Sequence, residues 1–386
     1  MPKIKIAQVI TRMDWGGSPD IVSILCQRLD REKYDIRLIC GVTVYPSGKN
    51  KEFFKKFEGN IFRLTRLKRN VNIFNDVFSF FSLYRLFRRE RFDIVHTHTT
   101  KAGVLGRISA VCAGVPAVIH SPHGHIFYGY FGPLVSKAVV VLERFMTHFT
   151  DKIIALTELE KRDLVTFKVA GPEKIVVINS GLELNNYRKI NVDTGRIRDG
   201  LGLEEDMALA GFVGRLEPVK GPEYFIRAAA LVAGELTEVK FLIVGEGSLR
   251  NKLESECEKS GIRDKVIFTG WREDITEILS ILNVLVLPSL NEAVGRVLIE
   301  AGACGVPVVA ARVGGVPEVV KDNQTGILVP PGEPEALAGA MIALLEDKEK
   351  RQRMGERAEN WVGAKFGVNK MVERVSSLYH EIRGGK

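Results

Sequence analysis

Short apolar runs recur through the first half of the chain, separated by segments whose apolar residues follow helical spacing. The runs predict buried strands at Ile4–Ile10, Tyr34–Gly41, Phe92–Val95, Pro116–His120, Asp151–Ala155 and Lys174–Ile178. The segments between them predict helices at Asp20–Leu29, Ile73–Arg91, Lys101–Ala113 and Glu158–Lys168. A strand, a glycine-bearing loop at 12–19, a helix and a second strand are typical of the start of a doubly wound α/β domain.

The second half repeats this alternation. It predicts strands at Leu209–Val213, Phe241–Gly245, Val266–Thr269, Val284–Leu287 and Val306–Ala310, and helices at about Gly295–Cys304 and Val368–Ile382, with two more helices after Gly332. A chain of 386 residues is too long for one ordinary core. We therefore predict two doubly wound domains, residues 1–185 and 186–365, joined by a hinge near 179–187 and followed by a C-terminal helical segment, 366–386.

The composition, 45% hydrophobic and 26% charged, is that of a soluble globular protein. Four of the five cysteines lie in apolar runs and none forms a CxxC pair, so we expect reduced, buried thiols. No secretory signal opens the chain and no apolar run reaches about 18 residues. We expect a cytoplasmic protein.

The net charge of +8 is unevenly distributed. Residues 1–185 hold 28 Lys and Arg against 17 Asp and Glu (+11), and the remainder holds 27 against 30 (−3). The excess is concentrated in 49–91, where cations alternate with phenylalanines, a pattern typical of a helix that lies on an anionic membrane. An ordinary core-facing stripe in 73–87 and a solvated face in 49–57 remain alternatives. We predict a membrane surface rather than nucleic acid as the anionic partner.

Candidate chemistry lies in 288–319, after the buried strand Val284–Leu287. Glu292 falls in the loop and Glu300 inside the next helix, and carboxylates so placed suit hydrogen bonding to a polyol. Gly314 and Gly315 would let backbone N–H groups approach an anion. In open α/β sheets, ligands bind beyond the carboxyl ends of the strands. The stretch therefore predicts a sugar-nucleotide pocket.

A second candidate is the loop Gly214–Gly221, which follows the first strand of the second half. Arg215 and Lys220 lie five residues apart, just ahead of a helix starting near Pro222. Two cations and a positive helix end would converge on one phosphate group.

These motifs resemble the family-four retaining glycosyltransferases. Glu292 to Glu300 matches their E-x7-E, with Pro288-Ser289 before it and Gly305-Val306-Pro307 after it, and Gly214–Gly221 is similar to their G-R-L-x-x-x-K-G. The usual Gly-Phe after the first glutamate is Ala293-Val294 here. The resemblance implies the GT-B fold: two Rossmann-like domains face each other across a cleft, and the C-terminal helix crosses back to the first domain.

The resemblance also implies roles for individual residues. Arg215 and Lys220 would stabilise the leaving diphosphate together with N–H groups after Gly314-Gly315, Glu300 would bind the ribose, and Glu292 and His123 would bind hydroxyls of the donor sugar. The implied donor-binding residues are Gly16, Gly17, Gly214, Trp271, Arg272, Glu292, Val294, Gly295, Arg296, Val297 and Glu300. No enzymic nucleophile stands out, which fits front-face attack. Neither a metal nor a cofactor is expected.

Two further segments, 96–107 and 121–127, are similar to bacterial exopolysaccharide and capsule transferases. Those enzymes act on lipid-diphosphate-linked acceptors, so we expect a nucleotide-sugar donor, a glycan or lipid-linked acceptor and peripheral contact with the inner face of the cell membrane.

Other interpretations remain open. His96 and His98 point to one side of a strand as a metal pair would, although no third ligand follows at useful spacing. A UDP-sugar 2-epimerase shares the fold, and the charge alone would suit a non-catalytic membrane or nucleic-acid binding protein. The chain contains no DxD and no GxGxxG, which disfavours metal-dependent transferases and NAD enzymes.

Overall fold

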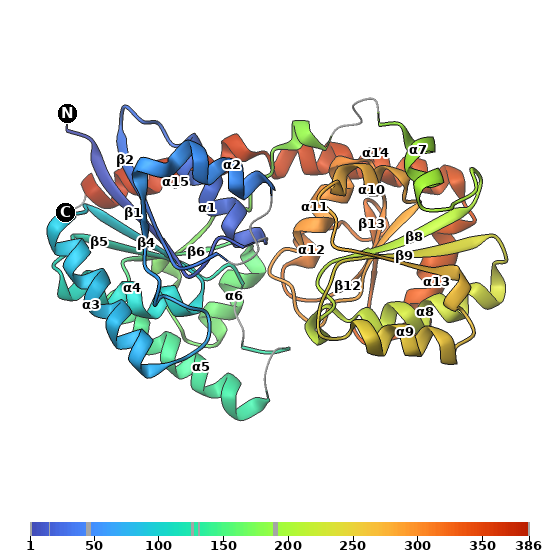
Figure 1. Cartoon of the computed structure of the whole chain (residues 1–386), viewed down its shortest axis with the longest axis horizontal. Coiled ribbons are helices and arrows are strands. Elements are labelled where there is room, and N and C mark those ends of the chain that lie inside the picture. Colours follow the sequence, from blue (N-terminus) through green and yellow to red (C-terminus); the bar gives the residue numbers. More distant parts are fainter. Residues whose placement is uncertain are drawn as a thin grey trace. The chain divides into compact units, whose positions relative to one another are not determined.

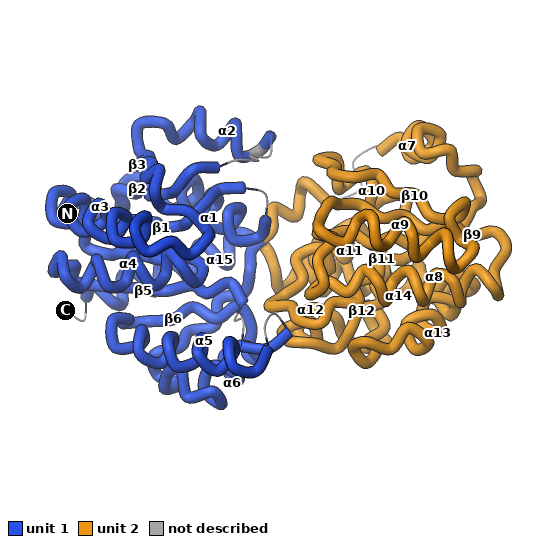
Figure 2. The backbone as a smooth tube through the Cα atoms, turned by 60° about the horizontal axis from the view of Figure 1, so that its bottom comes forward, with its two compact units in different colours: residues 1–181, 368–386 blue, residues 182–367 orange. Residues whose placement is uncertain are grey.

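The computed structural model describes residues 2–14, 16–43, 48–124, 127–129, 132–187 and 192–384. The chain forms two compact units (Figures 1 and 2). Unit 1 comprises Met1–Gly181 together with Val368–Lys386, and unit 2 comprises Leu182–Gly367. His125 and Ile126, which belong to a segment similar to capsule transferases, lie outside the described residues.

Unit 1 is built on a seven-stranded parallel sheet with the strand order β3-β2-β1-β4-β5-β6-β7. The strands are β1 (Ile4–Ile10), β2 (Tyr34–Cys40), β3 (Ile61–Arg63), β4 (Ile94–His98), β5 (Ala117–Ser121), β6 (Lys152–Ala155) and β7 (Ile175–Val177). The helices of this unit are α1 (Gly17–Arg28), α2 (Gly48–Phe57), α3 (Ile73–Glu90), α4 (Thr100–Cys112), α5 (Pro133–Met146), α6 (Glu158–Thr166) and α15 (Val368–Gly384).

Alternate residues of β1 face two helical layers, because successive side chains of a strand point to opposite faces. Ile6 belongs to a core cluster with residues of α1, α2 and α15, whereas Ala7 packs with residues of α3 and α4. Both faces of the sheet are therefore covered, as a parallel sheet requires. This burial explains why the strands are recognisable as nearly continuous apolar runs.

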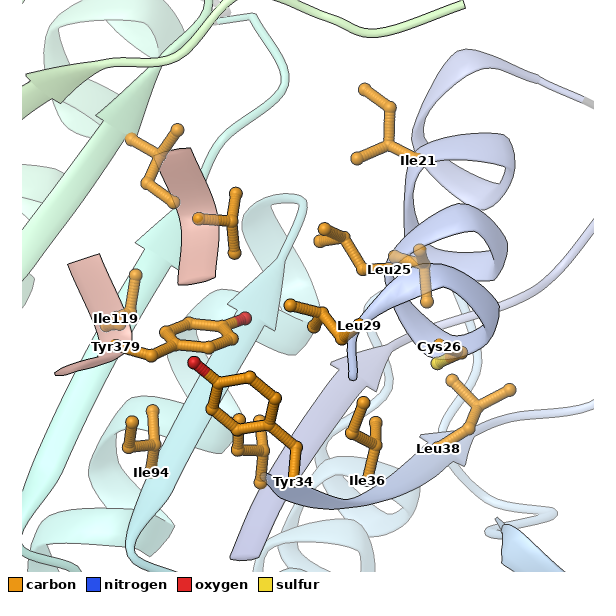
Figure 3. Packing of buried hydrophobic residues seen from close by; sticks show 14 of the residues in the cluster. Ile21, Leu25, Cys26, Leu29, Tyr34, Ile36, Leu38, Ile94, Ile119 and Tyr379 are labelled. Atoms are coloured by element: carbon orange, nitrogen blue, oxygen red, sulfur yellow. The ribbon is translucent and has the colours of Figure 1, made fainter. Parts of the chain in front are cut away.

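The C-terminal helix α15 completes the core of unit 1. The Tyr379 side chain is fully buried, and its ring lies 6.0 Å from that of Tyr34 in an edge-on arrangement (Figure 3). The Tyr34 hydroxyl lies 2.7 Å from the Ser376 hydroxyl. The return of the last helix to the first unit, expected from the resemblance, is confirmed.

Unit 2 carries a six-stranded parallel sheet with the strand order β10-β9-β8-β11-β12-β13. The strands are β8 (Ala208–Val213), β9 (Val239–Val244), β10 (Val266–Gly270), β11 (Val284–Leu287), β12 (Val308–Ala311) and β13 (Gly326–Val329). The helices are α7 (Thr194–Gly200), α8 (Pro222–Glu235), α9 (Arg250–Lys259), α10 (Ile275–Ile281), α11 (Arg296–Ala303), α12 (Val316–Val319), α13 (Pro334–Leu345) and α14 (Lys348–Lys365). Its core includes Phe212, Phe225 and Phe241, all fully buried.

The structure divides the basic segment 49–91 between two helices, α2 and α3, whose exposed faces differ. On α2, Phe53 and Phe57 are buried in the core, so the cations there do not alternate with exposed phenylalanines. On α3 the buried apolar residues, Leu83, Leu86 and Phe87, all lie in the second half, and Ser79 is the buried residue of the first half. The expected core-facing stripe is therefore wrong for the first half of α3. None of the helices in the described ranges combines the length and apolar character needed to cross a bilayer.

Four cysteines are buried free thiols, as expected, and Cys112 is exposed. Burial raises the pKa of the Cys40 thiol to about 12 and that of Cys257 to about 11. Because the thiolate is the reactive form, these two cysteines are inert at neutral pH.

Candidate active site

The candidate site of unit 2 lies where the strand order reverses, between the neighbouring strands β8 and β11. Ligands of open α/β sheets bind beyond the carboxyl ends of the strands at such a point. The loops after these strands touch: the Leu290 N–H donates to the Val219 carbonyl at 2.8 Å. Gly221 has a φ of 62°, and a Cβ there would come within 2.3 Å of the Pro288 carbonyl oxygen. The G-R-L-x-x-x-K-G loop thus ends in glycine because the next loop leaves no room for a side chain.

Lys220 and Glu292, assigned to different ends of the donor by the resemblance, meet directly. The Lys220 ammonium donates to Glu292 Oε1, and the Ser289 hydroxyl donates to the same oxygen at 2.9 Å. Ser289 is fully buried and Glu292 is 8% exposed. Charge-assisted hydrogen bonds in such surroundings are strong, so both side chains are held in place. Ser289 was not predicted, although its position three residues before Glu292 put it within reach.

Arg215 begins the same loop and is exposed. Within the described part of the chain it has no carboxylate partner. The neighbouring Gly214 N–H donates to the Val244 carbonyl at 2.9 Å, so this predicted donor-binding residue already uses its backbone donor inside the unit. Of Gly214 and Arg215, it is therefore the exposed guanidinium of Arg215 that remains open to an anion.

Gly314 and Gly315 have a structural purpose in addition to the one expected. Gly314 has a φ of 47°, and a Cβ there would lie 2.0 Å from the Glu292 carbonyl oxygen. The Gly315 N–H donates to that oxygen at 3.0 Å, and the Val316 N–H donates to the Val313 carbonyl at 3.0 Å. These N–H groups are engaged within the protein in this structure, and their contact with a diphosphate stays a prediction. The glycines hold the loop that carries Glu292.

The start of α11 brings the remaining residues of the E-x7-E motif together. Gly295 precedes the helix with a φ of 67°. Arg296 lies 4.0 Å from Glu300 one turn later, and both side chains are mostly buried. Val297 is half-buried, whereas Val294 is 3% exposed and packs inward. Since Val294 occupies the usual phenylalanine position, its side chain contributes to packing rather than to a wall of the site.

Trp271 and Arg272 follow β10, the edge strand, and β9 and β8 separate them from the β11 loop. Trp271 is 46% exposed, and Arg272 Nε donates to Asp274 at 2.7 Å. They share the carboxyl edge of the sheet with the Lys220–Glu292 pair.

In unit 1 the corresponding reversal lies between β1 and β4. Gly16 and Gly17, at the end of the loop after β1, lead into α1, and the Gly16 carbonyl accepts from the Asp20 N–H at 3.2 Å. His123 follows β5 and has a φ of 57°, a left-handed conformation that is uncommon for histidine. All three lie at the carboxyl edge of the sheet of unit 1.

A chain of buried side chains supports His123. Its Nε2 lies 2.8 Å from His98 Nδ1, and His98 Nε2 lies 2.7 Å from Gln8 Oε1. The Gln8 amide donates to the Tyr379 hydroxyl at 2.9 Å, and that hydroxyl lies 2.7 Å from His96 Nδ1. Because Gln8 Oε1 can only accept, His98 carries its proton on Nε2 and accepts from His123 through Nδ1. The network therefore gives His123 a fixed partner at Nε2.

The same network replaces the metal pair considered for His96 and His98. His96 Nε2 lies 2.8 Å from the Ser121 hydroxyl, so both nitrogens of both rings are hydrogen-bonded within the protein. Burial lowers the pKa of His96 to about 3 and that of His98 well below its usual value. Both rings are neutral at pH 7. A buried amide within a strand, Gln8, was the sequence signal for such a network, since it requires partners.

The two parallel sheets, with the last helix returned to the first unit, have the GT-B arrangement of glycosyltransferases. Solved structures agree: HepE of Anabaena, crystallised with UDP and glucose, superposes with a TM-score of 0.84 at 22% identity over 98% of this chain and all of that one. Sucrose-phosphate synthase of Thermosynechococcus elongatus gives 0.83 at 21% over the whole of both chains.

Sequence comparison defines the family. The models for glycosyl transferases group 1 and for glycosyltransferase family 4 match residues 193–361 and 15–186. The UDP-Gal:alpha-D-GlcNAc-diphosphoundecaprenol alpha-1,3-galactosyltransferase of Escherichia coli is 31% identical over 98% of this chain and 97% of its own. The D-inositol 3-phosphate glycosyltransferase of Thermobispora bispora is 30% identical over 75% of this chain and 71% of its own. The chain belongs to this family of glycosyltransferases, which sets aside the epimerase and the non-catalytic binding protein.

Proposed function

We propose that this enzyme transfers a sugar, with retention, from a nucleotide-diphospho-sugar to a glycan or lipid-linked acceptor in cell-surface polysaccharide synthesis. The observation that carries the proposal is the Lys220–Glu292 pair at the strand reversal of unit 2, with Arg215 in the same loop as Lys220. The names of the similar proteins support the substrates: one uses UDP-galactose and a diphosphoundecaprenol-linked acceptor, and another was crystallised with UDP and glucose.

The cations supply the stabilisation that the reaction needs. Breaking the bond between the sugar and the diphosphate leaves negative charge on the leaving phosphate. A group accelerates this step only if it binds the transition state more tightly than the ground state. Lys220, held by Glu292, is already in place and needs little reorganisation when the charge develops, which is the property that makes such stabilisation effective.

Retention follows in this proposal from front-face attack. Glu292 is ion-paired with Lys220 and hydrogen-bonded to Ser289, which suits a carboxylate that binds sugar hydroxyls better than one that attacks carbon. The leaving phosphate would take the proton of the acceptor hydroxyl as the new bond forms. His123, held at Nε2 by His98, would contact a hydroxyl of the donor sugar.

The direct test is a thermal-shift panel of UDP-, GDP- and ADP-sugars, followed by a transfer assay with a diphospholipid-linked acceptor. We expect a UDP-sugar to raise the melting temperature and to support formation of an α-linked product. Failure of every nucleotide sugar to bind, or an inverted linkage in the product, would contradict the proposal.

Chelation tests the proposed charge stabilisation by side chains. In this proposal arginine and lysine side chains, rather than a metal ion, stabilise the charge on the leaving group, and one such contact can be worth as much as an oxyanion contact. We therefore expect EDTA to leave the transfer rate within about twofold of its starting value. Initial rates with and without EDTA are the measurement. Complete loss, restored by a divalent ion, would mean that a metal carries this charge.

Replacing Glu300 with Gln tests the proposed ribose contact. A neutral amide is a poorer acceptor than a carboxylate, so donor affinity should fall by about tenfold, the ratio of a charged to a neutral hydrogen bond. The dissociation constant for UDP, measured by calorimetry, reports this contact without catalysis. Glu318→Gln, near the end of the short helix α12, is the matched control. Affinity unchanged in Glu300→Gln would move the ribose elsewhere.

We also propose that the enzyme works at the cytoplasmic face of the cell membrane. A diphospholipid-linked acceptor stays in the bilayer, so the protein must reach it there.

A further inference from the structure

Helix α5 presents its apolar residues outward. Its exposed large apolar residues are Leu134, Val135, Val141, Leu142 and Phe145, with Leu134 85% and Phe145 56% exposed. Its buried residues are Ser136, Val140, Glu143 and Met146. A surface helix of a soluble domain normally has the opposite distribution, with the apolar stripe toward the core. The sequence analysis did not predict this helix.

A buried ion pair fixes this orientation. Arg107 on α4 is fully buried, and its Nη2 donates to both carboxylate oxygens of Glu143, at 3.1 and 2.9 Å. Rotating α5 to bury its apolar residues would leave the Arg107 charge without its partner. Leaving one charge of a buried pair without its partner is strongly destabilising. The outward apolar face is therefore built into the packing of unit 1.

Helix α3 has a similar surface at its first half. Its exposed large apolar residues are Ile73, Phe74, Val77, Phe78 and Phe81, and Phe74 is 77% exposed; Val71, just before the helix, is exposed as well. Their spacing places them on one side of the helix. Unlike α5, the helix buries its second half normally, so the exposed face is confined to the end near residue 73.

Both surfaces belong to one helical layer of unit 1. Helix α4 contacts α3 and α5: the Ser109 hydroxyl donates to the Phe80 carbonyl at 3.2 Å, and Arg107 pairs with Glu143. Both outer helices follow strands of the same parallel sheet, so both begin at its carboxyl edge (Figure 1). His123, which follows β5, lies at the same edge. We call the exposed apolar residues of 71–81 and 134–145 the docking surface.

The charges around the docking surface are positive. Exposed cations of the two helices and of the loop before α3 are Arg66, Lys68, Arg69, Arg85, Arg88, Arg89, Lys137 and Arg144. The Arg66 guanidinium lies 4.1 Å from the centre of the Phe78 ring. By contrast, each carboxylate of α3 and α5 is ion-paired with a protein cation: Asp76 with Lys101, Glu90 with Arg89 and Glu143 with Arg107. An apolar surface bordered by cations matches the headgroup region of an anionic bilayer, whereas a second copy of the same surface would be repelled.

We propose that the outer faces of α3 and α5 insert into an anionic bilayer and hold unit 1 against it. The inference deepens the proposed function, because it names the surface that would bring the enzyme to a lipid-linked acceptor. It narrows the membrane contact expected in 49–91 to residues 71–81 and adds helix α5. On α2 the exposed residues Lys51, Lys55 and Lys56 have no exposed phenylalanine beside them, so that helix contributes charge alone.

Vesicle flotation tests the proposal. The vesicles contain phosphatidylethanolamine and phosphatidylglycerol in equal parts, with pure phosphatidylcholine as the neutral comparison. We expect the wild type to float with the anionic vesicles only. Phe74→Ser with Phe78→Ser on α3, and Leu142→Ser with Phe145→Ser on α5, should each weaken partitioning by about tenfold or more, because binding scales with the apolar area inserted.

The control replaces exposed lysines outside the docking surface: Lys51→Ser, Lys55→Ser and Lys56→Ser together. It should weaken flotation less than either pair of apolar replacements. All variants should keep the wild-type melting temperature and the wild-type rate on a short water-soluble acceptor.

Three results would overturn the docking surface: no flotation of the wild type, equal flotation of wild type and apolar variants, or a wild-type dimer in light scattering that these variants abolish. Failure of the proposed function would look different. Then the protein would float as expected, yet transfer no sugar to either a lipid-linked or a water-soluble acceptor.

Discussion

Arg215→Ala and Lys220→Ala should each lower kcat/KM for sugar transfer by about 2–4 kcal/mol of transition-state stabilisation, the range for loss of one contact to a developing oxyanion. Both residues lie in the loop after β8, and Lys220 is additionally held by Glu292. The physical reason is the charge that develops on the leaving phosphate, which each cation would stabilise. Steady-state kinetics with a UDP-sugar measure the loss.

The structure adds an asymmetry between these two variants. Removing Lys220 leaves the 8% exposed Glu292 without its cation, whereas Arg215 is exposed and has no carboxylate partner among the described residues. Lys220→Ala should therefore also lower the melting temperature, while Arg215→Ala should not. Arg227→Ala, which removes a largely exposed arginine paired with Glu256, is the control and should leave kcat/KM unchanged.

The double variant separates shared from independent roles. If both cations act on one diphosphate, the loss in the double variant should be smaller than the sum of the single losses. Fully additive losses would show that the two residues act on different groups, and a loss below about threefold in either single variant would remove it from the proposed mechanism.

The strands and the two motif loops were predictable because their signals are local. The runs at Ile4–Ile10 and Val284–Leu287 agree with β1 and β11 residue for residue, since a parallel strand buried on both faces is continuously apolar. The loops at 214–221 and 288–300 were identified by the spacing of Arg215, Lys220, Glu292 and Glu300. That the first of these loops ends in glycine has a tertiary cause instead, the close approach of the Pro288 carbonyl from the next loop.

The interactions that were missed are not local. Gln8 and Tyr379 are 371 residues apart, and no spacing in the sequence could show that the amide donates to the phenol. Similarly, Gly314 and Gly315 suggested an anion site, but their position against the Glu292 carbonyl depends on how two loops pack. The burial of the aromatic residues of 49–91 could not be predicted for the same reason, because burial of Phe53 and exposure of Phe74 depend on tertiary packing.

Helix α5 was not predicted from the sequence, and the distribution of its residues explains why. Five of its large apolar residues are exposed, while its buried residues include Ser136 and Glu143 beside Val140 and Met146, so apolar and buried positions correspond only in part. Recognising that distribution required knowing that Arg107 on α4 is fully buried and needs a carboxylate. The Arg107–Glu143 pair therefore connects the fold of unit 1 to the docking surface. It also leads to a prediction about stability.

Glu143→Ala should lower the free energy of unfolding of unit 1 by about 3–5 kcal/mol, the cost of breaking a buried ion pair by removing one partner. Arg107 is fully buried, and burial lowers the pKa of its guanidinium while Glu143 opposes that shift. Without the carboxylate, the guanidinium keeps only hydrogen bonds to neutral oxygens: the Gly103 carbonyl at 2.9 Å and the Thr150 hydroxyl at 3.5 Å. Hydrogen exchange of α4 amides in the full-length protein reports the opening of unit 1 directly.

Two companion variants establish the cause of that loss. Glu349→Ala removes the carboxylate of an exposed pair with Arg353, and exposed pairs contribute about 0–1 kcal/mol, so its stability should hardly change. Arg107→Met combined with Glu143→Leu removes both charges, and replacing a buried pair with apolar residues is often neutral or stabilising by about 1–4 kcal/mol. Recovery in the double variant would show that the unpaired Arg107 charge, rather than a cavity at Glu143, destabilises Glu143→Ala. If Glu143→Ala cost less than about 1 kcal/mol, the pair would not be what holds the apolar face of α5 outward.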